Sequence, residues 1–166
     1  MNNYPTMTRN HALTLITAFC LAMLFGACEK EETPPNSIPL PATIDLARLN
    51  VQLTDQSFTA DGFRFNAYRA EAQTDGVLLA FPENNNLSSL ELDLTEAAGI
   101  ERISIDLFNN FDPEISYWNN GQLIGQVPLP IAYGDVVVVI DSLAGQPITS
   151  LRIASAETTV RSISLE

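Results

Sequence analysis

Residues 117–122 read "YWNNGQ", and these side chains are of the types that bind sugars. An exposed aromatic ring stacks on the apolar face of a sugar, and side-chain amides donate and accept hydrogen bonds with its hydroxyls. Tyr117 and Trp118 are neighbours in a predicted strand, so their rings point to opposite faces and at least one faces away from the inner layer. A ligand site is therefore predicted from these two rings and the amides of Asn119, Asn120 and Gln122. Alternatively, Trp118 fills the core and Asn120-Gly121 only makes a hairpin turn.

Two polar loops are also candidates for ligand or ion binding. They read "FPENNN" at 81–86 and "NNFDPE" at 109–114. Carboxylates and amide oxygens coordinate Ca²⁺, and they also bond sugar hydroxyls. The candidate residues are Glu83, Asn84, Asn85, Asn86, Asn109, Asn110, Asp112 and Glu114. No cofactor is expected apart from a structural calcium ion, for which Asp112 and Glu114 are the proposed ligands. The alternative is an ordinary pair of loops, because Asn and Asp satisfy their own backbone in turns.

Arg64 and Arg69 occur in the stretch "FRFNAYRA", where aromatic and polar residues alternate imperfectly. A strand arginine on the polar face can hold a ligand carboxylate with two parallel hydrogen bonds. The alternative is an ion pair with a neighbouring Asp or Glu. We therefore add both arginines to the candidate ligand-binding residues.

The types of the remaining reactive side chains exclude several kinds of catalytic and metal-binding site. The only histidine is His11 and the only cysteines are Cys20 and Cys28. The chain after Cys28 therefore has no Ser-His-Asp or Cys-His arrangement and no His/Cys zinc site. A pair of carboxylates, as in glycoside hydrolases, is the catalytic alternative, but no acid sits in a recognised motif, so we expect no enzymatic activity. A net charge of −12 argues against nucleic acid as a partner.

The N-terminus has the features of a secretory signal. Residues 12–25 form an uncharged and mostly apolar run, which is short for a membrane span and suits the hydrophobic region of a signal peptide. Phe25-Gly26-Ala27-Cys28 follows and resembles the lipobox of bacterial lipoproteins. The resemblance implies a type II signal peptide and a lipid on Cys28 that anchors the protein to the outer membrane. The alternatives are an ordinary signal peptide or a short buried helix.

Residues 29–41, "EKEETPPNSIPLP", are charged and then rich in proline, which is typical of a semi-rigid tether. The acidic residues after Cys28 resemble the lipoprotein export signals of the Bacteroidetes, which implies display at the cell exterior. A solvated spacer is the alternative. The expected organisation is a signal peptide at 1–27, the lipidated cysteine and tether at 28–42, and a β-sandwich domain at 43–166.

From Thr43 onward the apolar pattern has a period of two, as in strands with one wet face. Leu90, Leu92 and Leu94 alternate with acids, and Ile103, Ile105 and Leu107 repeat the pattern. The apolar run at 135–141, "DVVVVID", predicts a strand buried on both faces. Asp-Gly and Asn-Gly pairs at 61–62, 75–76 and 120–121 mark turns. We predict an all-β fold, an antiparallel sandwich of about eight to ten strands.

The strand order of residues 58–166 resembles the galactose-binding-type jelly-roll domains of carbohydrate-binding modules. The resemblance rests on the pair "SLELDL" and "IERISIDL", the hairpin "EISYWNNGQLIGQV", and the closing "ITSLRIAS" and "VRSISLE". It implies a jelly roll and a glycan ligand. The expected function is thus a lipid-anchored, non-enzymatic module that binds glycan. The alternatives are a structural protein that contacts an envelope partner through a sheet face or edge and, less favoured, a carboxylate glycoside hydrolase.

Overall fold

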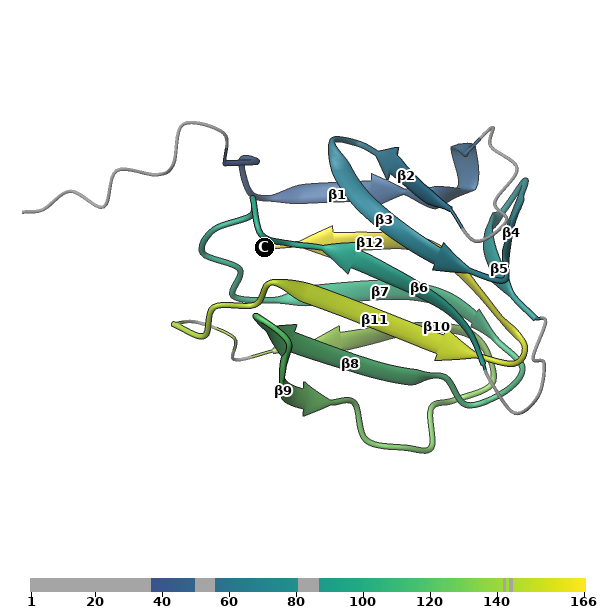
Figure 1. The fold of residues 1–166 in the computed structure, drawn as a ribbon. Coiled ribbons are helices and arrows are strands. Elements are labelled where there is room, and N and C mark those ends of the chain that lie inside the picture. The colour runs from purple at the N-terminus through teal and green to yellow at the C-terminus, as the bar shows by residue number, and fades with distance from the viewer. Residues whose placement is uncertain (1–36, 50–55, 81–86, 142, 144) are drawn as a thin grey trace, which may run out of the picture. The chain divides into compact units, whose positions relative to one another are not determined.

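The computed structural model describes residues 37–49, 56–80, 87–141, 143 and 145–166. This part of the chain forms two antiparallel sheets that pack face to face (Figure 1). We call the sheet nearer the viewer in Figure 1 the front sheet. Its order is β2 (Ser57–Ala60), β3 (Phe63–Tyr68), β6 (Ser88–Asp93), β11 (Ser150–Ser155), β8 (Glu114–Asn119) and β9 (Gln122–Gln126).

The other sheet, which we call the back sheet, contains the remaining strands. Its order is β10 (Gly134–Ile140), β7 (Ile103–Asn109), β12 (Thr158–Leu165), β5 (Gly76–Leu79) and β4 (Ala70–Gln73), with β1 (Ala42–Asp45) also paired to β12. The 3₁₀ helix η1 (Leu46–Arg48) follows β1. No helix in the described residues is long and apolar enough to cross a membrane.

The order of the last eight strands is that of a jelly roll. The back sheet runs β5-β12-β7-β10 and the front sheet runs β6-β11-β8-β9, so two Greek keys fold over each other. The predicted all-β antiparallel sandwich is confirmed. The described part has twelve strands rather than eight to ten. The difference arises partly because β1, β2 and β4 have only four residues each, which is too few for alternation to be evident.

The core lies between the sheets and is built from alternate residues of each strand. The predicted inward residues are confirmed: Leu92 is 1% exposed, and Ile105 and Leu107 are fully buried. Two of the three predicted turns are confirmed by positive φ at Asp61 and Gly62 and at Asn120 and Gly121, as a two-residue hairpin turn with Asp-Gly or Asn-Gly requires. The third is displaced by one residue, since Thr74 and Asp75 form the turn and Gly76 begins β5 opposite Gln73. Local alternation and turn chemistry therefore place the strands of this domain.

The prediction for residues 135–141 is wrong. Strand β10 was expected to be buried on both faces, but Val137 is 59% exposed and Val139 is 41% exposed. The reason is that β10 is the edge of the back sheet, and its outer face is uncovered in the part that the structure describes. Here the valines reflect the preference of β-branched residues for strands rather than burial on both sides.

The folded part begins before Thr43, the expected start of the domain. Ile38 forms a parallel bridge with Ala97 and donates its backbone N–H to the carbonyl oxygen of Glu96 at 2.9 Å. Ile38 and Leu40 also pack against the core. The last residues of the predicted tether therefore belong to the sandwich. Residues 1–36, with the predicted signal peptide and Cys28, lie outside the described residues.

Candidate functional site

The outer face of the front sheet gathers polar and aromatic side chains from four adjacent strands. Strand register places Asn66 opposite Glu91, Glu91 opposite Arg152, and Arg152 opposite Ser116. These residues lie on the outer face because their strand neighbours, such as Phe65 and Leu92, are buried in the core. We call this surface the Trp118 face. It consists of Arg64, Asn66, Tyr68, Glu91, Asp93, Ser116, Trp118 and Arg152.

Trp118 lies on this outer face and is half-buried. Its Nε1–H donates to Ser116 Oγ at 3.0 Å, and the register places Leu123 beside it on the edge strand β9. Tyr117 points the other way and packs against the core. Gly125 on β9 makes room for it, since a Cβ at that position would overlap the Tyr117 hydroxyl. Of the two predicted rings, Trp118 is thus the one on the outer surface and Tyr117 is a packing residue.

The guanidinium groups of Arg64 and Arg152 are exposed on the same face. Within the described part of the chain, no hydrogen bond or ion pair engages either group. Asp93 is the acid that lies beside Arg64 across the sheet, and it bonds to Thr95. Its Oδ1 accepts from the backbone N–H of Thr95 at 3.0 Å and from the Thr95 hydroxyl at 2.7 Å. The alternative predicted for Arg64, an ion pair with a neighbouring acid, is therefore not found among the described residues.

Arg69 does not share this surface. It follows β3 and precedes β4, at the point where the chain passes from the front sheet to the back sheet. Its φ of 52° marks a sharp change of direction, and the residue is half-buried. The prediction that Arg69 is a strand residue is wrong, because β3 ends one residue earlier, at Tyr68.

The three predicted amide residues cluster at the end of the β8–β9 hairpin, close to Trp118. Asn119 pairs with Gln122, and Asn120 lies in the turn between them. The backbone N–H of Asn120 donates to Thr149 Oγ1 at 2.7 Å, which fixes the turn against the loop before β11. Gln122 is exposed, whereas Asn119 is half-buried. Asn120 is therefore held as a turn residue, and Gln122 has the more accessible amide.

Asn109 was predicted as a loop residue available to a ligand, and this placement is wrong. It is the last residue of β7 and is fully buried. Its Nδ2 donates to the carbonyl oxygen of Ala132 at 3.0 Å and lies 3.4 Å from that of Ile131, while its Oδ1 accepts from Thr158 Oγ1 at 3.1 Å. Every polar atom of this amide is used inside the protein. Asn109 thus joins the end of β7 to β12 and to the segment before β10.

The remaining loop residues are only partly described. Asp112 Oδ1 accepts from the backbone N–H of Ile131 at 3.0 Å, while Asn110 and Glu114 are exposed. No group of three or more His, Cys, Asp or Glu among the described residues is arranged to hold a metal ion. The calcium site at Asp112 and Glu114 stays a prediction. Glu83, Asn84, Asn85 and Asn86 lie outside the described residues.

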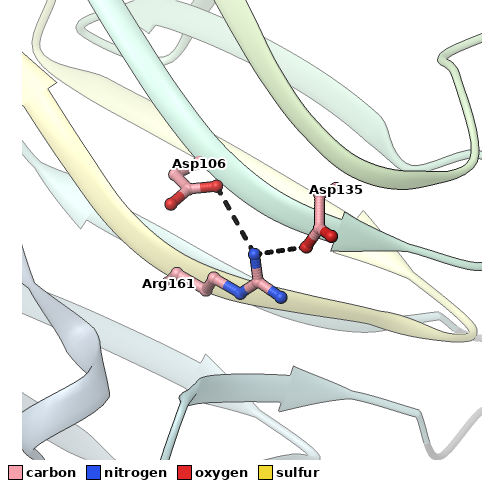
Figure 2. A network of polar contacts seen from close by, with 3 residues as sticks. All are labelled: Asp106, Asp135 and Arg161. Atoms are coloured by element: carbon pink, nitrogen blue, oxygen red, sulfur yellow. Dashed lines mark hydrogen bonds and ion pairs between the residues drawn. The ribbon is translucent and has the colours of Figure 1, made fainter.

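A polar network on the back sheet was not predicted (Figure 2). The pairing of β12 with β7 skips Arg161, which is the extra residue of a β-bulge. Its guanidinium donates to Asp135 Oδ1 at 2.6 Å, lies 3.9 Å from Asp106 Oδ1, and is 5.7 Å from the centre of the Phe108 ring. This arginine therefore ties together β7, β10 and β12. The sequence signal was the broken alternation at 160–163, where two polar residues separate two apolar ones.

A shallow depression of about 650 Å³ lies next to Arg161. It is lined by Thr43, Asp45, Ala47, Thr74, Asp75, Asp106, Arg161 and Ser162. The acids here have structural partners, since Asp45 Oδ1 accepts from the backbone N–H of Ala47 at 3.0 Å and Asp106 faces Arg161. The guanidinium in this depression is thus already neutralised, unlike those of the Trp118 face.

Six residues of the Trp118 face were not among the predicted candidates: Asn66, Tyr68, Glu91, Asp93, Ser116 and Arg152. Each occupies a polar position in an alternating strand, which the sequence shows, but strand register alone brings them together. No family model matches the chain, and no curated protein matches it significantly in sequence. The site is therefore defined by its geometry.

Proposed function

We propose that this protein is a lipid-anchored, non-enzymatic module that binds glycans on the Trp118 face. The observation that carries the proposal is the common face of Trp118, the 41%-exposed Tyr68, and the polar row between them. Aromatic rings stack on sugar rings, and the amide, carboxylate and guanidinium groups of the row bond hydroxyls. The two rings lie three strands apart across the sheet and four residues apart along the strands. Standard strand spacings then put roughly 20 Å between them. This span suits a chain of several sugars.

The shape of the surface supports binding rather than cleavage. The Trp118 face is the side of a sheet, so an extended polymer can lie along it. The predicted anchor at Cys28 would display such a surface from the outer membrane. Acidic residues close to the anchor favour the cell exterior as the location.

Replacement of Trp118 by alanine should weaken glycan binding by about 5- to 150-fold. Stacking of one planar ring on an aromatic side chain contributes about 1–3 kcal/mol where it has been measured for nucleobases, and each 1.4 kcal/mol is about tenfold in affinity. The ligand would be found with a glycan array on the full chain in detergent micelles, and the affinity measured by titration calorimetry. Tyr133→Ala is the matched control, because Tyr133 is a 69%-exposed aromatic just before β10 of the back sheet.

Two outcomes would contradict this proposal. The first is a wild-type protein that binds no glycan of the array, with or without calcium. The second is a Trp118→Ala variant that binds as tightly as the wild type.

The edge strand β10 favours a second candidate function, assembly with an envelope protein by strand addition. All seven residues of β10 pair with β7 without a bulge, and its other edge is unpaired in the described part. The strand has no proline or lysine, the residues that often protect such edges. Val137 and Val139 point outward. A partner strand could bond the free backbone groups, and another layer of the partner could cover both valines.

Replacement of Val137 by lysine should abolish co-purification of such a partner from detergent-solubilised membranes. A charge on the outer face of the edge strand opposes burial against a second sheet, and the exposed site should tolerate it without unfolding. The measurement is the yield of one stoichiometric protein that co-purifies with the wild type. Thr59→Lys, an exposed position on β2 of the front sheet, is the control. A monodisperse wild-type monomer without a partner, or a partner retained by Val137→Lys, would count against assembly.

A further inference from the structure

We infer that the Trp118 face selects anionic glycans, those bearing carboxylate or sulfate groups, through the guanidinium groups of Arg64 and Arg152. This inference rests on the proposed glycan-binding function and names its substrate class. Guanidinium binds a carboxylate or sulfate with two parallel hydrogen bonds, which gives both strength and orientation.

The two arginines differ from Arg102 and Arg161, which have acidic partners among the described residues. Arg102 Nε bonds Asp141 Oδ1 at 2.9 Å, and Arg161 bonds Asp135 at 2.6 Å. The chain has 20 acidic and only 8 basic residues, so a partner for an arginine is easily supplied. Arg64 and Arg152 nevertheless remain unengaged within the described part, and both lie on the one face that also carries Trp118.

The local acids explain what kind of contact the ligand must make. Glu91 lies directly opposite Arg152, and Asp93 lies on the same strand. These acids, together with a net charge of −12, oppose long-range attraction of an anion. Recognition must therefore come from direct contact, in which a ligand anion meets the guanidinium fork itself. Such contacts persist at physiological salt, where charges more than about 8 Å apart are largely screened.

The spacing of the two arginines points to a repeating ligand. Arg64 on β3 and Arg152 on β11 are two strand intervals and two residues apart, which places their Cα atoms about 12 Å from each other by standard spacings. A polymer with an anionic group on each sugar, or on alternate sugars, can present two groups at such a distance. The same polymer can reach Trp118. If the strand pairing is continued by one residue, Trp118 and Arg64 fall in the same row of residues across the sheet.

The experiment compares pairs of polymers with the same sugar backbone, one anionic and one neutral. The full chain in detergent micelles is titrated at 0.15 M salt, a Debye length of about 8 Å, with polygalacturonate and its methyl-esterified form, and with dextran sulfate and dextran. The wild type should bind the anionic member of at least one pair 10-fold or more tightly than the neutral member. The double variant Arg64→Gln/Arg152→Gln should lose this preference but keep the weaker neutral binding. Trp118→Ala should weaken both members of the pair.

The control variant is Arg102→Gln, which removes an exposed arginine outside the Trp118 face and should leave both affinities unchanged. Equal affinity for the two members of each pair would overturn this inference and leave the glycan-binding function standing. Anion binding that survives in the double variant would also overturn it. A wild type that binds neither these polymers nor any glycan of the array contradicts the proposed function, and the inference with it.

Discussion

Substitution of Cys28 by alanine is expected to abolish lipid attachment, and so to release the protein from the membrane fraction or to leave it unprocessed. Cys28 lies at the end of an apolar run, after Gly26 and Ala27, and the thiol is the predicted site of modification. Each buried CH₂ of an acyl chain contributes about 0.8 kcal/mol, so two or more chains hold a protein stably and their loss is close to an all-or-none effect. The measurement is incorporation of an alkyne-tagged fatty acid in a Gram-negative host, followed by membrane fractionation.

Cys20 provides a matched control for this experiment. It is the other cysteine of the chain and lies inside the apolar run that is predicted to be removed. Cys20→Ala should therefore be labelled and fractionated like the wild type. Label on the Cys28→Ala protein at the wild-type level would show that this cysteine is not the anchor.

Replacement of Gly76 by alanine is expected to lower the free energy of unfolding by about 2–4 kcal/mol, through overpacking and backbone strain together. Gly76 begins β5, is buried, and has a φ of 146°, which L-residues rarely adopt. A Cβ at this position would overlap the backbone carbonyl oxygen of Val160 on β12 and press against the Thr159 side chain. Since Val160 is itself fully buried in the core, its carbonyl cannot move aside cheaply. Urea denaturation of the variant and the wild type measures the difference.

Gly62→Ala separates the two causes of this effect. Gly62 also has positive φ, at 86°, but nothing lies within 4 Å of an added Cβ. It should therefore cost only the backbone strain, about 1 kcal/mol. If both variants lost the same stability, close approach of β5 to β12 would not be the reason for a glycine at position 76.

Predictions from local pattern succeeded where local physics governs the outcome. Alternation placed Leu92 and Ile105 in the core, because successive strand residues point to opposite faces whatever the neighbouring strand is. The Asp61-Gly62 and Asn120-Gly121 turns followed from backbone freedom at those two positions. Both signals are carried by residues adjacent in the chain. The anchor at Cys28 stays a prediction, and it too rests on residue identity and order.

Predictions that depended on neighbours far along the chain failed or were missed. Asn109 was assigned to a binding loop because the pattern "NNFDPE" is polar, yet Thr158 and Ala132 satisfy its amide inside the fold. The valines of β10 were assigned to a doubly buried strand, yet the strand is an edge. In each case the deciding contact joins residues more than 20 positions apart or is set by strand order. Neither the distant contact nor the strand order can be deduced from the local periodicity of the sequence.

The candidate site divides in the same way. The sequence by itself determined that Trp118 and Tyr117 face opposite sides, that Arg64 is a polar residue of a strand, and that His-dependent catalysis is excluded beyond the first residues. Only the tertiary structure decided that Trp118 is the outward ring, that Arg64 and Arg152 share its face, and that Arg161 is bound to Asp135. The physical reason is that the position of a residue in its own strand determines the face on which its side chain lies. Its neighbours on that face are determined by the register between strands. Register is determined by packing of the whole core.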